Sequence, residues 1–192
     1  MKPAPSTAST LLAALLLTAG CSEPGPMAPP PAESHAARAP ITIVDGVEQV
    51  RGEIGPGAQY ALFVPEEWNG SLVLYAHGFR DPGTPVSLPT QDNLPLLQQR
   101  MLDLGFAVAY SSFSENGFAV KDGMQRTQQL RGVFASYFGH PEKTLLMGHS
   151  LGALVVLGLA ERFPQHYDGV LAMCSLAAGS PMTIDYVGQV RV

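Results

Sequence analysis

Residues 143–160 constrain this chain most, because they join a short apolar strand, a serine between two glycines and an apolar helix. The serine is Ser150, in the pentapeptide Gly148-His149-Ser150-Leu151-Gly152. A serine lifted above a sheet on a sharp turn needs a strained backbone that the surrounding packing must hold. Glycine two residues before and after it removes side chains that would block the close approach of strand and helix. The segment therefore predicts a G-x-S-x-G nucleophile elbow, with a purely structural turn as the alternative.

The composition indicates a folded α/β protein. The chain has 192 residues, enough for one domain with a core, and 46% of them are hydrophobic against 14% charged. The net charge of −5 provides no basic surface, so binding of a nucleic acid is not expected. No motif in the sequence implies a metal ion or an organic cofactor.

The first 20 residues differ in kind from the rest. Lys2 precedes an apolar run at residues 11–18 that is too short for a permanent membrane span, which predicts a secretory signal peptide over residues 1–20. The sequence Leu17-Thr18-Ala19-Gly20-Cys21 resembles the lipobox of bacterial lipoproteins. That resemblance implies a lipid on Cys21, and so an exported protein anchored to a membrane of the cell envelope, in the periplasm or at the cell surface. An ordinary cleaved signal peptide with a chance cysteine is the alternative.

Residues 21–40 are rich in Pro, Ala, Ser and Glu and have no hydrophobic period, which predicts a tether before a folded domain. If Cys21 is lipidated, Cys174 has no other cysteine in the chain to pair with. Cys174 is expected to be a small buried hydrophobic residue in a strand. A disulfide to a segment outside this sequence is the alternative.

Strand and helix patterns alternate over residues 41–174. Strands are predicted at residues 41–44, 48–54, 59–64, 71–76, 106–110, 144–147 and 170–174. The residues Leu94, Leu97, Met101 and Leu104 share one helical face before Gly105, and a second apolar stripe from Leu130 to Tyr137 predicts a helix that ends near Gly139. This alternation predicts a mostly parallel sheet with helices on both faces.

Two motifs together resemble a known family. His77-Gly78 follows one predicted strand, and the Ser150 pentapeptide follows another about seventy residues later. The pair resembles the α/β-hydrolase superfamily of serine esterases and lipases, over roughly residues 59–174. The resemblance implies a three-layer α/β-hydrolase-like fold in which Ser150 is the nucleophile. It also implies that the backbone N–H groups of Leu151 and Phe79 form the oxyanion hole.

The same resemblance implies supporting roles for neighbouring residues. His77 and Gly78 shape the oxyanion loop, and His77 is not the catalytic base. His149 packs beside the turn, between the elbow glycines Gly148 and Gly152.

The polar residues that follow two of the strands leave alternatives open. Arg80 is expected to be a solvated surface residue, with contact to a substrate carboxylate as the alternative. Residues 111–117 are expected to cap the following helix through Ser114 or Asn116, to form a wall of the active site, or both.

The sequence departs from the family after Ser150, where the family order is serine, then acid, then histidine. The one later histidine, His166, is predicted at the amino end of a strand and so at the wrong edge of the sheet. Asp185 is the candidate acid, with an ordinary surface acid as the alternative. The strands are also fewer than the eight of the family. We therefore expect residues 41–192 to be the N-terminal portion of a longer α/β-hydrolase domain, with the acid and the histidine in missing sequence and this chain nearly inactive by itself.

The expected activity is hydrolysis of a carboxylic ester or a related acyl bond through an acyl-enzyme on Ser150, with a small-molecule or lipid-like ester as substrate. One alternative is a non-catalytic lipoprotein that keeps the fold for binding or for envelope structure. Another is a peptidase or thioesterase on the same fold, because fold and nucleophile do not specify the substrate. The sequence does not predict an oligomeric state.

Overall fold

The computed structural model describes residues 38–90, 94–177, 179, 182 and 185. The predicted signal peptide at residues 1–20, Cys21 and most of the tether at residues 21–40 therefore lie outside the described residues. From Arg38 onward the chain forms a separate compact unit.

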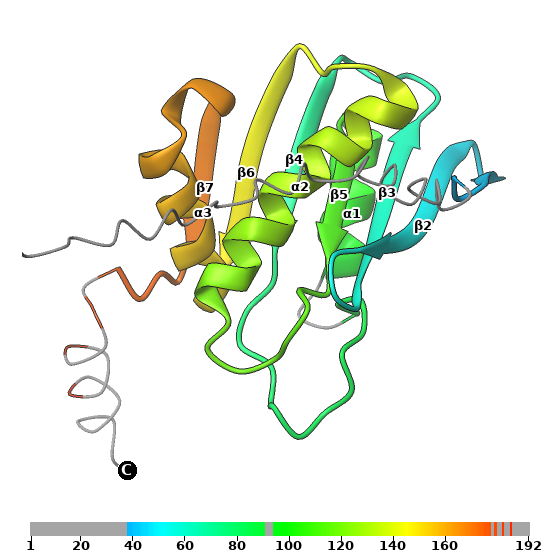
Figure 1. Cartoon of the computed structure of the whole chain (residues 1–192). Helices are drawn as coiled ribbons and strands as arrows, with labels where there is room; N and C mark the ends of the chain where they lie inside the picture. Colours follow the sequence, from blue (N-terminus) through cyan, green and yellow to red (C-terminus); the bar gives the residue numbers. More distant parts are fainter. Residues whose placement is uncertain (1–37, 91–93, 178, 180–181, 183–184, 186–192) are drawn as a thin grey trace, which may run out of the picture. The chain divides into compact units, whose positions relative to one another are not determined.

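The described part of this unit is built on one seven-stranded sheet with the strand order β1-β2-β3-β5-β4-β6-β7 (Figure 1). Strands β5, β4, β6 and β7 are mutually parallel, β2 points the same way, and β1 and β3 run in the opposite direction. The sequence predicted every strand to within two residues and the mostly parallel sheet is confirmed. The strands are β1 (Ile41–Val44), β2 (Val47–Ile54), β3 (Ala58–Pro65), β4 (Ser71–Ala76), β5 (Ala107–Ser111), β6 (Lys143–His149) and β7 (Gly169–Met173).

Helices cover both faces of the sheet, as predicted. Helices α2 (Val120–Phe138) and α3 (Leu151–Arg162) pack on one face, and α1 (Leu94–Asp103) packs on the other (Figure 1). A short 3₁₀ helix, η1 (Pro164–His166), connects α3 to β7. Within the described part of the chain, none of these helices is long and apolar enough to cross a membrane.

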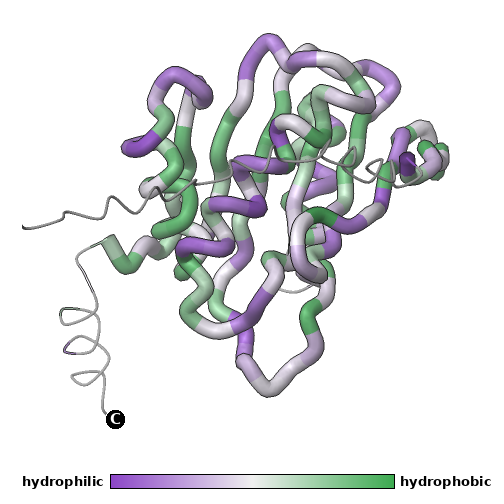
Figure 2. The backbone as a smooth tube through the Cα atoms, in the orientation of Figure 1, coloured by the Kyte–Doolittle hydropathy of each residue, from purple (hydrophilic) through white to green (hydrophobic). Residues whose placement is uncertain are grey.

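Strand β4 lies inside the sheet, between β5 and β6, and all six of its residues are buried. Leu72 and Leu74 belong to the core beneath α2 and α3, whereas Val73 and Tyr75 belong to the core beneath α1. This is the alternation of side chains that a strand covered on both faces requires. Figure 2 shows the hydrophobic residues along the central strands and hydrophilic segments along α2.

The predicted turns and helix ends are present where glycine allows a left-handed backbone. Asp45 and Gly46 have φ angles of 51° and 76°, which suit the tight hairpin between β1 and β2. Gly105 follows α1 with φ of 80°. Leu104 does not belong to the buried face of α1, because the helix ends at Asp103, and its side chain is 52% exposed. The prediction for Leu104 was wrong.

Candidate active site

Ser150 lies on the turn between β6 and α3, with φ of 52° and ψ of −120°. Few residues other than glycine adopt such a backbone, and it costs free energy that the surrounding structure must supply. The Ser150 N–H donates to the carbonyl of Met173 at the end of β7 (2.9 Å), and the Ser150 carbonyl accepts from the N–H of Ala153 (3.0 Å). The strained serine is thus held by the sheet on one side and by the helix on the other.

The two glycines of the pentapeptide lie where the backbone segments touch. A Cβ on Gly148 would lie 2.3 Å from the carbonyl oxygen of Gly152. A Cβ on Gly152 would lie 2.1 Å from the carbonyl oxygen of Ala76 and 2.6 Å from that of His77. A side chain at either position would force backbone apart, which is the physical reason for glycine at both.

The loop after β4 comes against the elbow, so the structure brings the two motifs together. A Cβ on Gly78 would lie 2.9 Å from Nε2 of His149 and 3.4 Å from Cβ of Ser150. Both segments follow parallel neighbouring strands, β4 and β6, at their carboxyl ends. Ligands of open α/β sheets gather at this edge.

His77 is buried, with 4% of its surface exposed, and its ring is held on two sides. Nδ1 donates to the carbonyl of Gly78 (2.7 Å), and the ring stacks on Phe113 with centroids 3.9 Å apart. Burial lowers the pKa of His77 below its ordinary 6.5, although the backbone carbonyls of Gly78 and Ser112 act in the opposite direction. His77 is therefore a neutral, fixed support for the loop.

His149 packs beside the turn. Its Nδ1 lies 2.7 Å from the hydroxyl of Tyr75, and the two rings stack with centroids 6.0 Å apart. Tyr75 is itself buried in β4, so the imidazole is held against the sheet on one side and Gly78 on the other.

The two residues expected to donate from the backbone differ in exposure. Leu151 is the first residue of α3 and is buried, whereas the side chain of Phe79 is 57% exposed. The N–H groups at a helix start have no partner inside the helix, so the N–H of Leu151 suits an anion.

Arg80 is not freely solvated, so that expectation was wrong. Its guanidinium donates to the carbonyl of Ser87 and, at 3.2 Å, to the Ser87 hydroxyl. The side chain closes the loop over residues 80–87 from within, because it reaches a partner seven residues later.

The capping prediction for residues 111–117 was also wrong. Helix α2 begins after Ala119, and no side chain caps it. The amide of Asn116 donates instead to the carbonyl of Thr84 (2.8 Å), and the N–H of Gly117 donates to the carbonyl of Arg80 (2.8 Å). Residues 111–117 therefore hold the loop that follows His77-Gly78, a contact that local sequence does not signal.

The histidine and the acids that follow Ser150 lie away from the elbow or at the surface. His166 is in η1, before the amino end of β7, and its Nδ1 lies 3.0 Å from the amide of Gln128. Asp168 accepts from the N–H of Thr144 (2.7 Å) at the same edge. Asp185 has an exposed side chain. Among the residues that the structure describes, no group of three or more His, Cys, Asp or Glu could hold a metal ion.

Cys174 is exposed and unpaired, so the expectation of a buried residue in a strand was wrong. Strand β7 ends at Met173, and Cys174 follows it with φ of 49°. The Met173 carbonyl accepts the N–H of Ser150, and Cys174 is the next residue along the chain. The exposed thiol is therefore one residue from a contact that holds Ser150.

Comparison with known proteins gives one curated relative. No family model matches the chain. The o-phthalyl amidase of Xanthobacter agilis is 32% identical over 136 residues, which cover 69% of this chain and 28% of the amidase. The chain thus spans little more than a quarter of the length of that relative.

Solved structures share the fold at low sequence identity. The brefeldin A esterase, a bacterial homologue of human hormone sensitive lipase, matches with a TM-score of 0.50 and 20% identity over 69% of this chain and 41% of its own. An S-formylglutathione hydrolase from Agrobacterium tumefaciens matches with a TM-score of 0.50 and 14% identity over 68% of this chain and 59% of its own. The elbow, the mixed sheet and these neighbours agree: the described part of the chain has the α/β-hydrolase fold.

Proposed function

We propose that the protein is a serine hydrolase that cleaves a carboxylic ester or a related acyl bond, with Ser150 as the nucleophile. The observation that supports this most is the backbone of Ser150, held at φ of 52° above the sheet with Gly78 packed against its Cβ. Strain of this kind persists where the surrounding structure maintains it, and it gathers at active sites.

The chemistry follows two steps. The Ser150 hydroxyl attacks the acyl carbon and loses its proton to a base, and the N–H groups of Leu151 and Phe79 stabilise the oxyanion. Collapse of this intermediate expels the alcohol, which takes up the proton, and leaves an acyl-enzyme that water then hydrolyses.

We expect the acid and the histidine of the triad outside the described residues, in a longer protein of which this chain is a part. His77 and His149 are held by Gly78 and Tyr75, and His166 lies at the other edge of the sheet. The large unmatched part of the amidase is compatible with this view. The described residues by themselves would then turn over substrate slowly.

The substrate we favour has an apolar acyl or alcohol group. Phe79 and Phe118 are 57% and 62% exposed, and each adjoins one partner of the hydrogen bond between Gly117 and Arg80. Two exposed aromatic rings on loops that share a hydrogen bond suit a small aromatic or lipid-like ester.

Amide hydrolysis is the second candidate, and the name of the o-phthalyl amidase favours it. The amine leaving group of an amide is poorer than the alcohol of an ester and must be protonated as it leaves. Amide hydrolysis therefore depends more on a general acid than ester hydrolysis does. Comparing p-nitrophenyl acetate with p-nitroacetanilide on the same preparation would distinguish them.

The test of the nucleophile is labelling of the full-length protein by a fluorophosphonate. Labelling and hydrolysis of p-nitrophenyl acetate are expected to disappear in Ser150→Ala and to persist in Ser136→Ala, which removes an exposed hydroxyl on α2. A full-length protein that neither labels nor hydrolyses esters would favour a non-catalytic role for the fold in binding or envelope structure.

We also propose that the protein is exported and anchored to the cell envelope through a lipid on Cys21. The lipobox-like sequence before Cys21 supports this. Incorporation of labelled palmitate into the wild-type protein and its loss in Cys21→Ser would be the expected result. Export without incorporation would favour an ordinary cleaved signal peptide.

A further inference from the structure

The peptide group between Gly78 and Phe79 carries both a fixed carbonyl and the expected oxyanion donor. Its carbonyl oxygen accepts from Nδ1 of His77 at 2.7 Å. A peptide group is planar, and in the trans form its N–H points opposite to its C=O. No cis peptide bond is present among the described residues. The orientation of the His77 ring therefore sets the direction of the Phe79 N–H.

The His77 ring is in turn set by Phe113. The two rings stack with centroids 3.9 Å apart and planes inclined by 25°, and both residues are buried. Phe113 has φ of 57°, which is rare and costly for an aromatic residue. Its ring also packs tightly on α2, since a Cβ on Gly123 would lie 2.9 Å from two of its ring carbons.

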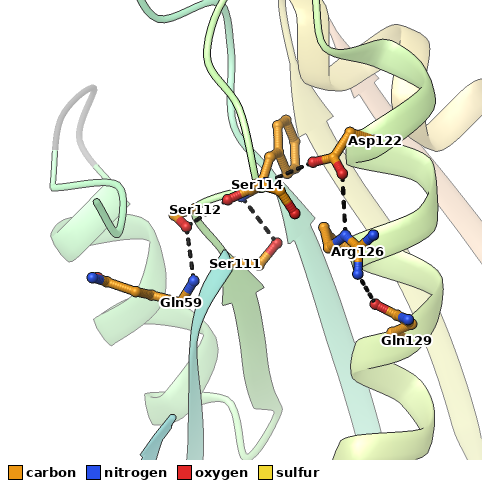
Figure 3. Close-up of polar contacts among 8 residues, drawn as sticks. Gln59, Ser111, Ser112, Ser114, Asp122, Arg126 and Gln129 are labelled. Atoms are coloured by element: carbon orange, nitrogen blue, oxygen red, sulfur yellow. Dashed lines mark hydrogen bonds and ion pairs between the residues drawn. The ribbon is translucent and has the colours of Figure 1, made fainter. Parts of the chain in front are cut away.

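Polar contacts on both sides hold Phe113 in this conformation. Figure 3 shows two of them, between Ser112 and Gln59 and between Ser114 and Asp122. Before it, the Ser112 hydroxyl accepts from the N–H of Gln59 (2.9 Å) and donates to the Phe113 carbonyl (2.7 Å). After it, the N–H of Ser114 donates to the carboxylate of Asp122 on α2 (2.6 Å). A bond to a charged acceptor in a partly buried site is among the stronger hydrogen bonds.

A buried arginine fixes that carboxylate. Nε of Arg126 donates to Asp122 at 3.1 Å, and its Nη1 donates to Gln129 at 2.6 Å. Arg126 is 4% exposed, and Gly55 leaves room for its guanidinium. Figure 3 shows Asp122, Arg126 and Gln129 in sequence along α2. The polar contacts of α2 thus reach the backbone next to Phe113.

We infer that Phe113, held by Asp122, is a positioning residue for the oxyanion hole: its ring fixes His77, and His77 fixes the Phe79 N–H. This inference rests on the proposed serine hydrolase function. An N–H aimed in advance at the developing charge needs no reorganisation during the reaction. Neither Phe113 nor Asp122 needs to touch the substrate.

The first test compares two buried phenylalanines in the full-length protein. Phe113→Leu removes the ring beneath His77, whereas Phe134→Leu makes the same change in α2, where the ring contacts Trp68 and Phe138. With p-nitrophenyl acetate, Phe113→Leu is expected to lower kcat about tenfold to a hundredfold and to leave KM within about twofold, because a misdirected donor weakens transition-state binding only. Phe134→Leu is expected to change kcat less than about threefold.

The role of Asp122 is tested by a second matched pair of variants. Asp122→Asn keeps an acceptor oxygen but removes its charge. Asp103→Asn makes the same change at an α1 residue that accepts from the side chain of Gln99. Asp122→Asn is expected to lower kcat by about threefold to tenfold, and Asp103→Asn to leave it unchanged. Equal kcat values in both members of either pair would overturn the inference.

An NMR measurement decides the inference without catalysis. The Nδ1 proton of His77, buried and donated to Gly78, is expected as a slowly exchanging ring signal in the wild type and in Phe134→Leu, and to be lost in Phe113→Leu. Its absence from the folded wild type, or its persistence in Phe113→Leu, would overturn the positioning role. A different result would separate the two proposals: the signal is present in the wild type and lost in Phe113→Leu, but no hydrolysis depends on Ser150. That result would reject the proposed function and leave the support of the loop by Phe113 established.

Discussion

The carbonyl oxygen of Ala76 lies 2.1 Å from the place that a Cβ on Gly152 would occupy. Ala76 ends β4, Gly152 is in the first turn of α3, and Ser150 lies two residues before it. The backbone of β4 and that of α3 therefore meet close to the candidate nucleophile. The atoms of Ala76 that come closest are its backbone carbonyl carbon and oxygen, so this is a contact between main chains.

Gly152→Ala is expected to destabilise the protein by about 1–3 kcal/mol or more, because the added methyl meets backbone that cannot rotate away. The matched change is Gly132→Ala in α2, where a Cβ would have no neighbour within 4 Å. That variant is expected to be more stable than wild type by about 0.5–1 kcal/mol. Urea unfolding of the three proteins measures both effects, and a stable Gly152→Ala would contradict the close contact.

The strain at Ser150 is testable without substrate. Glycine tolerates φ of 52° better than alanine, so Ser150→Gly is expected to be more stable than Ser150→Ala by roughly 1 kcal/mol. At Ser136, inside α2, the order is expected to reverse, since glycine disfavours an ordinary helix position by about 1 kcal/mol. Thermal unfolding of the four variants gives both differences. If the alanine variant were the more stable one at both positions, Ser150 would not be strained.

Burial of His77 predicts a dependence of stability on pH. Its pKa is lowered in the folded state, so as pH falls through the ordinary value of 6.5 the unfolded chain binds a proton that the folded protein does not. The free energy of unfolding should therefore decrease below about pH 6.5, by at most about 1.4 kcal/mol per pH unit, until the folded-state pKa is reached. The charges of Arg80 and His149 near the ring act in the same direction.

His77→Asn keeps an amide donor near the position of Nδ1 and does not titrate, so it is expected to flatten this dependence. His140 is exposed, and His140→Asn is expected to leave the dependence as in wild type. Urea unfolding at about pH 7.5 and about pH 5.5 supplies the comparison. An equal slope in the wild type and His77→Asn would assign the effect to other groups.

The exposed thiol of Cys174 predicts reaction with a thiol reagent in the folded protein. Wild type is expected to release one more equivalent of thionitrobenzoate from Ellman's reagent than Cys174→Ser does, before any denaturant is added. A bulky maleimide adduct is also expected to slow fluorophosphonate labelling, because residue 174 follows the carbonyl that accepts the N–H of Ser150. If the thiol reacts only after unfolding, its exposure in this structure would be contradicted.

The sequence predicted the sheet and the sharp strand-to-helix turn at Ser150 well because their physical causes are local. Short strand-like segments between turn residues predicted the strands, and alternation with helical stripes predicted the covered faces. The glycines at 148 and 152 predicted the close approach of backbone around Ser150, and the distances from Gly152 to Ala76 confirm it.

The contacts that the sequence did not predict join residues that are far apart along the chain. Asn116 was expected to cap the helix that begins four residues later, and it bonds Thr84, 32 residues earlier. Arg80 was expected to be solvated, because the residues next to it gave no sign that the loop would bring Ser87 within hydrogen-bonding distance of its guanidinium. Cys174 was placed inside a strand that ends one residue before it.

The sequence also did not predict the buried hydrogen bonds around Asp122. The composition of α2 signals an amphipathic helix, but it does not show that Asp122 would accept from the backbone of Ser114 or that Arg126 would be buried beside Gly55. Such partners are selected by the packing of α2 on the sheet.

The hydrogen bonds from Asn116 to Thr84 and from Gly117 to Arg80 have a consequence for engineering new specificity. The loops over residues 80–87 and 111–117 share these bonds, so exchanging one of them with a homologous segment would leave the other without its partners. A chimera should therefore transplant both loops as a single cassette. Libraries are better placed at Phe79 and Phe118, whose exposed side chains can be varied while the backbone between the loops stays bonded.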